Sequence, residues 1–162
     1  VRHLGGAPDM DVFNRVIPRL APLGWHVVLH LDAPDIAELR PMIRALPVPF
    51  VIVHMGRVDA TLGPDQPALA ALLELARLDG CWIKVSGSER ISAPPFSAAV
   101  PIAASIVAAA PDRVLWGTDF PHPNLKGEVD EADLVDLVPA FAETEEAQRR
   151  LLVDNPARLY GF

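Results

Sequence analysis

The sequence predicts an α/β protein with a parallel sheet. Four short apolar runs, rich in β-branched or aromatic residues and bounded by Gly or Pro, alternate with segments of helical periodicity. Such alternation is typical of parallel βα units. The glycine-rich first crossover of a dinucleotide-binding fold is missing, while polar residues follow every apolar run. These features favour the carboxyl-terminal portion of a (β/α)₈ TIM barrel, with about four parallel βα units.

The first residue is Val1, and the opening Val-Arg-His-Leu-Gly-Gly reads like the exit of a strand whose beginning is missing. We therefore expect residues 1–162 to form a single partial barrel domain that lacks the amino-terminal strands. Half a barrel leaves open strand edges, so we expect this piece alone to be poorly stable.

The predicted elements follow from apolar spacing. The expected strands are Trp25–Leu31, Pro49–His54, Cys81–Val85 and Val114–Trp116. Apolar stripes predict helices over Asp9–Leu23, Ile36–Leu46, Gln66–Leu78, Ser97–Ala110 and Glu131–Phe141. Thr144 can cap a last helix toward Leu152, and Asn155-Pro156 opens a short terminal turn. Pro41 is expected to kink or split its helix.

The composition narrows the classes of partner. With 51% hydrophobic residues the chain can bury a sizeable core, and no apolar stretch is long enough to cross a bilayer. The net charge of −7 and the lack of a basic run argue against nucleic acid. The single cysteine, Cys81, fits a reducing compartment, so we expect a cytoplasmic protein without a membrane partner. Because the net charge of the chain is negative, a site that binds an anionic ligand must depend on local arginines.

Polar side chains, most of them ionisable, stand at all four strand exits, where parallel strands share one edge. These residues are His30 and Asp32; His54, Arg57 and Asp59; Lys84, Ser86 and Arg90; Asp119 and His122. His54 follows Val-Ile-Val directly and could be a satisfied core histidine. The equivalent position of Asp119, after a buried strand and Gly-Thr, favours a catalytic pair instead. Capping of the next turn is the alternative for Asp119.

Arg57 and Arg90 each follow a glycine shortly after a strand. Guanidinium groups bind carboxylates through two parallel hydrogen bonds, so two of them at one mouth suit a small dicarboxylate. The alternative is a salt bridge of each arginine with Asp59 or Glu89. His30 could face the pocket or pair with Asp32, and Lys84 remains unassigned.

Four blocks of sequence resemble the amidohydrolase superfamily, within its lactone-hydrolysing branch. They are HMGR (54–57), KVSGSER (84–90), WGTDFPHP (116–123) and LLVDNPARLYGF (151–162). The resemblance implies that Asp119 activates water and that His54 polarises the scissile carbonyl or ligates a metal. It implies that Arg57, Arg90 and Arg2 bind substrate carboxylates. His30 stands where a tyrosine would be expected at the substrate pocket.

The resemblance implies a hydrolase that opens a small anionic lactone such as 2-pyrone-4,6-dicarboxylate, in the degradation of aromatic compounds. The branch implies that no cofactor is required; Zn²⁺, held by His54 and Asp119, is the alternative. One His and one Asp cannot make a zinc site alone, and the family's strand-one His-x-His is absent. Two other functions stay open: a zinc-dependent sugar lactonase or decarboxylase, and a fragment that is inactive without a missing half.

Overall fold

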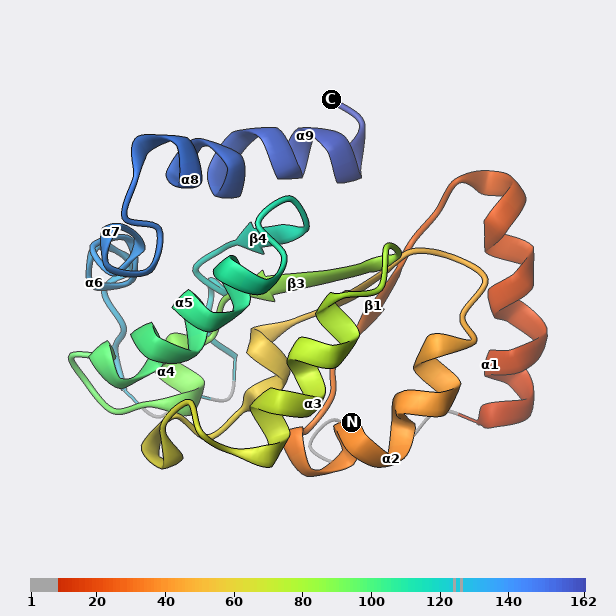
Figure 1. The fold of residues 1–162 in the computed structure, drawn as a ribbon, viewed down its shortest axis with the longest axis horizontal. Helices are drawn as coiled ribbons and strands as arrows, with labels where there is room; N and C mark the ends of the chain where they lie inside the picture. Colours follow the sequence, from red (N-terminus) through yellow and green to blue (C-terminus); the bar gives the residue numbers. More distant parts are fainter. Residues whose placement is uncertain (1–8, 124, 126) are drawn as a thin grey trace.

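The computed structural model describes residues 9–123, 125 and 127–162. Its centre is a four-stranded parallel sheet in the order β1-β2-β3-β4 (Figure 1). The strands are β1 (Val27–Leu29), β2 (Phe50–Ile52), β3 (Cys81–Val85) and β4 (Val114–Trp116). The predicted α/β class and parallel βα order are therefore confirmed. The strand β1 is shorter than its apolar run because Trp25, which is 62% exposed, lies outside the ladder.

The register brings the carboxyl ends of the strands to one edge. Leu29 pairs with Ile52, Ile52 with Ile83, and Val85 with Trp116. Each strand ends at or shortly after these positions. The segments that follow the four strands consequently leave the sheet at the same edge.

Three helices cover one face of the sheet: α2 (Ala33–Arg44), α3 (Pro67–Ala76) and α5 (Val100–Ala109) (Figure 1). Their apolar stripes join the main core through fully buried residues such as Ile36, Leu72 and Ile102. The prediction that Pro41 splits its helix is wrong, because α2 continues through Pro41 to Arg44. Pro41 is exposed, so water can hydrate the carbonyl group that loses its partner.

A smaller apolar cluster lies on the opposite face. It contains Val51, Val53, Trp82 and Leu115, against which Leu159 of the terminal helix α9 (Asn155–Tyr160) packs. Arg158 of α9 lies 5.0 Å over the Trp82 ring. The buried Asn155 side chain donates to the carbonyl oxygens of Pro111 and Val114, which ties α9 to the start of β4.

The remaining elements are short. They are α1 (Met10–Val16), η1 (Ile17–Leu23), η2 (His54–Arg57), η3 (Ala60–Leu62), α4 (Ser88–Ile91), η4 (Ser97–Ala99), α6 (Glu131–Val135), α7 (Val138–Phe141), α8 (Glu145–Arg149) and the π-helical turn η5 (Arg150–Asp154). Thr144 caps α8 as predicted, by accepting from the Ala147 amide. The terminal segment is a helix rather than the predicted turn, because α8, η5 and α9 follow one another without a break.

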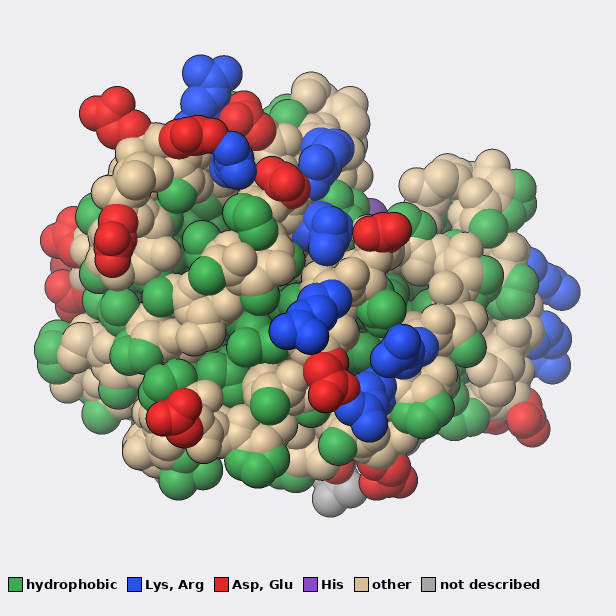
Figure 2. Space-filling view, viewed as in Figure 1, with side chains coloured by type: hydrophobic (Ala, Val, Ile, Leu, Met, Phe, Trp, Pro, Cys, Tyr) green, Lys and Arg blue, Asp and Glu red, His purple; other side chains and the backbone are tan. Residues whose placement is uncertain are grey.

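Charge is unevenly distributed over the surface. On the face shown in Figure 2, acidic side chains gather at one end, over the region of α6 to α8, while basic side chains cross the middle. The helix α6 begins with Glu131 and Asp133, and α8 begins with Glu145 and Glu146. Among the described residues, no helix is long and apolar enough to cross a bilayer.

Candidate active site

The segment after β2 forms a left-handed turn. His54, Met55, Gly56 and Arg57 all have positive φ, at 55°, 50°, 62° and 51°. Each non-glycine residue in this conformation costs about 1–2 kcal/mol. Backbone strain of this kind clusters at functional sites, and Asp119 (φ 72°) and His122 (φ 54°) share it at the end of β4.

The turn places the His54 ring between the ends of β3 and β4. Its Nδ1 lies 3.1 Å from the Ser86 hydroxyl oxygen, and its Nε2 lies 3.7 Å from Asp119 Oδ1. The His30 ring meets the His54 ring edge to face, with 5.0 Å between centroids. Two residues far apart in the sequence, His54 and Asp119, thus come together as the sequence predicts.

His54 is neutral near pH 7. Burial lowers the pKa of His54 to about 4, against the opposing pull of the Asp119 carboxylate. The pKa of His30 is also lowered, first by burial and then by the positive charge of Arg57. Because the neutral imidazole carries one N–H, His54 can donate one hydrogen bond without changing the charge of the site.

Arg90 contacts Asp119 directly. Its Nε donates to Asp119 Oδ2 at 2.5 Å and its Nη2 donates to the Pro123 carbonyl oxygen at 3.1 Å. The Arg90 side chain is only 9% exposed, and it also lies 3.7 Å from Glu89 Oε1. Arg90 therefore fixes the orientation of the Asp119 carboxylate.

Arg57 pairs with Asp32, at 3.0 Å between Nε and Oδ1. The alternative pairing of Arg57 with Asp59 is not found among the described residues, where Asp59 Oδ1 accepts from the amide and the hydroxyl of Thr61. The His30 ring contacts the His54 ring, and the alternative pairing of His30 with Asp32 stays a prediction. Arg57 thus stands at the same edge of the sheet as His54, with a quarter of its side chain exposed.

A second polar layer lies behind Arg90. His122 Nδ1 lies 3.3 Å from Glu89 Oε1, and His122 Nε2 lies 3.2 Å from Glu131 Oε1. Burial raises the pKa of Glu89, whose Oε2 has no hydrogen-bond partner among the described residues. This layer joins α4 and α6 to the loop that carries Asp119. An open hollow of about 570 Å³ adjoins it, with Phe120, His122 and Glu131 among its lining residues.

Metal binding can be tested against these side chains. Glu89, Asp119 and His122 bring ligand atoms within 4.8 Å of one another, which makes them a possible cation site. However, the Arg90 guanidinium already pairs with Asp119 and approaches Glu89. His54 and Asp119 supply two ligands, whereas a protein zinc site takes at least three. His54 and Asp119 therefore do not make a zinc site by themselves, whereas Glu89, Asp119 and His122 together reach the minimum of three ligand atoms.

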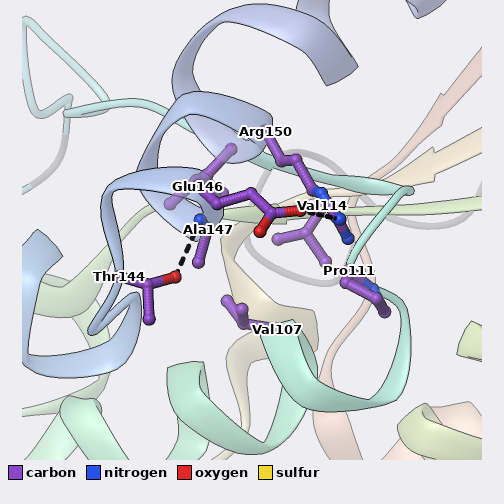
Figure 3. A pocket seen from close by; sticks show the side chains of 8 residues that line it. Val107, Pro111, Val114, Thr144, Glu146, Ala147 and Arg150 are labelled. Carbon is purple, nitrogen blue, oxygen red and sulfur yellow. Dashed lines mark hydrogen bonds and ion pairs between the residues drawn. The ribbon is translucent and has the colours of Figure 1, made fainter.

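A separate pocket of about 150 Å³ lies at the opposite end of β4, between α5 and α8 (Figure 3). Its polar side chains have partners: Glu146 pairs with Arg150, and the Thr144 hydroxyl accepts from the backbone amide of Ala147. None of the residues that line it belongs to the cluster around His54 and Asp119.

Sequence reasoning placed Ser86 and His122 at strand exits but assigned them no role, although they belong to the KVSGSER and WGTDFPHP blocks. It named Glu89 only as the alternative salt-bridge partner of an arginine, and the structure shows this contact with Arg90, at 3.7 Å. The position of Ser86 directly after β3 is the signal that could have identified it. Arg2 lies outside the described residues. Lys84 is half-buried within β3, and its side-chain carbon Cδ lies near Gly117.

The chain belongs to the amidohydrolase family, whose pattern it matches over residues 1–162. It is 42% identical to a 4-sulfomuconolactone hydrolase of Hydrogenophaga intermedia, over 98% of this chain and 54% of that protein. It is 43% identical to a 2-pyrone-4,6-dicarboxylate hydrolase of Comamonas testosteroni, over 99% of this chain and 56% of that protein.

A solved structure shows the same fold. A probable 2-pyrone-4,6-dicarboxylic acid hydrolase of Acinetobacter baumannii, with citric acid bound, superposes with a TM-score of 0.83 at 26% identity. The match covers 97% of this chain and 61% of that one. The chain thus spans about half the length of the curated relatives it matches. This agrees with the predicted fold class, the carboxyl-terminal portion of a (β/α)₈ barrel.

Proposed function

We propose that the protein to which this chain belongs hydrolyses a lactone ring bearing carboxylate groups, such as 2-pyrone-4,6-dicarboxylate. The observation that carries the proposal is the convergence of His54 and Asp119, 3.7 Å apart, at the edge of the sheet that also holds Arg57 and Arg90. The names of the two curated relatives, both lactone hydrolases, support the reaction class.

In this proposal Asp119 accepts a proton from the attacking water. Arg90 holds one carboxylate oxygen, so the other, which faces His54, is the oxygen that takes the proton. The hydroxide adds to the lactone carbonyl, and the N–H of His54 stabilises the negative charge that develops on the carbonyl oxygen. The C–O bond of the ring then breaks, the ring oxygen takes the proton that Asp119 had accepted, and the new carboxyl group releases its own proton to solvent as it becomes a carboxylate.

Arg57 and Arg90 orient the substrate through its carboxylates. A guanidinium group has five N–H donors, so each arginine can keep its present carboxylate partner and still bind the substrate. An anionic substrate needs local positive charge at its binding site, because the chain as a whole carries a net charge of −7 and would repel it. We propose that His30 forms part of the pocket wall and that Arg2 supplies a further carboxylate contact. No step is assigned to a metal.

The proposal is tested by measuring ring opening with the protein expressed from its complete gene. The substrates are a pyrone dicarboxylate, the matching monocarboxylate and a neutral sugar lactone. We expect turnover to fall with each carboxylate removed, and Arg90→Met to raise KM for the dicarboxylate by at least about tenfold. Preference for the neutral lactone, with Arg90→Met tolerated, would contradict the proposal and favour a sugar lactonase.

A further inference from the structure

Ser86 is a residue of the site that contacts His54 directly and to which the proposed reaction gives no role. It follows β3 directly, it is 3% exposed, and its hydroxyl oxygen lies 3.1 Å from His54 Nδ1. A neutral imidazole has one protonated and one bare nitrogen, and the two tautomers present opposite groups to the substrate. The hydroxyl can match either tautomer, as donor or acceptor.

The surroundings of His54 distinguish the two tautomers. Nε2 faces Asp119 Oδ1 at 3.7 Å, and a carboxylate oxygen is an acceptor only. A proton on Nε2 is attracted to this oxygen, whereas a bare Nε2 would direct its lone pair at a negative charge. With the proton on Nε2, the bare Nδ1 accepts from the Ser86 hydroxyl, and the Nε2–H points toward the negative Asp119 carboxylate, too far away to be consumed by a hydrogen bond to it.

The Nδ1 edge of the ring is also enclosed by the backbone. A Cβ built on Gly87 would lie 3.0 Å from His54 Nδ1 and 3.1 Å from His54 Cβ. The ring is therefore held against the end of β3, with Nδ1 toward Ser86 and Nε2 toward Asp119. Burial keeps the ring neutral by lowering the pKa of His54 to about 4.

We propose that Ser86 is a positioning residue that donates to His54 Nδ1 and thereby fixes the tautomer with the proton on Nε2. His54 then presents a hydrogen-bond donor to the oxygen that becomes negative during ring opening. A histidine that bound a metal through Nε2 would need the opposite tautomer. The inference deepens the proposed function, because the oxyanion role of His54 belongs to that proposal.

The experiment reads the tautomer directly. The ¹⁵N chemical shifts of histidine-labelled protein, expressed from its complete gene, report at pH 7 which ring nitrogen carries the proton. The His54→Asn variant identifies the His54 signals. We expect a protonated Nε2 and a bare Nδ1 in the wild type, and mixed tautomers in Ser86→Ala. Ser86→Thr keeps the hydroxyl and should keep the wild-type tautomer. Ser88→Ala is the matched control from the same loop and should leave the shifts unchanged.

Kinetics provide the second measurement. Loss of the hydrogen bond should lower kcat of Ser86→Ala about tenfold with KM changed less than about twofold, and Ser86→Thr should restore most of kcat. A proton on Nδ1 in the wild type, or a Ser86→Ala protein with unchanged tautomer and kcat, would overturn the inference. The ¹⁵N chemical shifts are measured without substrate, so they test the tautomer independently of the proposed reaction. If no lactone is hydrolysed while Nε2 carries the proton, the proposed function fails and the role of Ser86 in fixing the tautomer stands.

Discussion

Replacing Gly87 by alanine should damage both the stability and the activity of the protein. Gly87 has φ +72°, a conformation that costs a non-glycine residue about 1–2 kcal/mol. The added Cβ would lie 3.0 Å from His54 Nδ1 and 3.2 Å from Arg90 Cδ, closer than ordinary van der Waals contact. Overpacking of this kind costs about 1–3 kcal/mol. We therefore expect Gly87→Ala to lower the free energy of unfolding by about 2–5 kcal/mol.

Gly24→Ala is the matched control. Gly24 has φ +65° and ψ 21°, the same left-handed conformation as Gly87, yet a Cβ there would meet no atom within 4 Å, so this variant should lose only the backbone contribution of about 1–2 kcal/mol. The effect of alanine on the unfolded chain is the same in both variants and cancels in the comparison. Urea denaturation measures the two free energies, and a turnover assay should show a loss in Gly87→Ala alone. Equal destabilisation and equal turnover would refute the packing of Gly87 against His54.

Three further predictions concern buried groups and the extent of the chain. Burial raises the pKa of the Cys81 thiol to about 12, so a thiol reagent at pH 8 should modify Cys81 only after denaturation; rapid reaction of the native protein would contradict its burial. Because the pKa of His54 is about 4 in the folded state and 6.5 for an unperturbed histidine side chain, the unfolded state binds more protons between these values. The free energy of unfolding should therefore fall as the pH is lowered from about 6.5 to about 4, and His54→Asn should reduce this slope. Residues 1–162 alone should show no lactone hydrolysis, and measurable turnover by the purified chain would contradict this.

The sheet and the edge that carries the site follow from local patterns in the sequence. Apolar runs such as 49–54 and 81–85, alternating with helical segments, are typical of strands in a covered parallel sheet, and parallel strands place their exits together. The approach of His54 to Asp119 could therefore be predicted although two further βα units separate them in the chain. The family resemblance supplied the roles of these residues, and those roles remain predictions.

The partners of the charged groups could not be predicted in the same way. Arg57 pairs with Asp32, which is 25 positions away in the chain, and not with Asp59, which is two positions away, so distance in the sequence does not predict the partner. The left-handed turn at His54–Arg57 contains one glycine, so its conformation depends on tertiary packing rather than on local preference. The contact of Ser86 with His54 depends on that turn. The contact also requires that β2 and β3 lie side by side, because His54 follows β2 and Ser86 follows β3.

The most direct test of the proposed chemistry is the Asp119→Asn variant. The amide keeps the shape of the carboxylate but cannot accept the proton of the attacking water. We predict that kcat for the dicarboxylate lactone falls at least about 100-fold while the protein still binds the substrate, as measured by calorimetry. Near-normal turnover by Asp119→Asn would contradict the claim that Asp119 and His54 form the reacting pair.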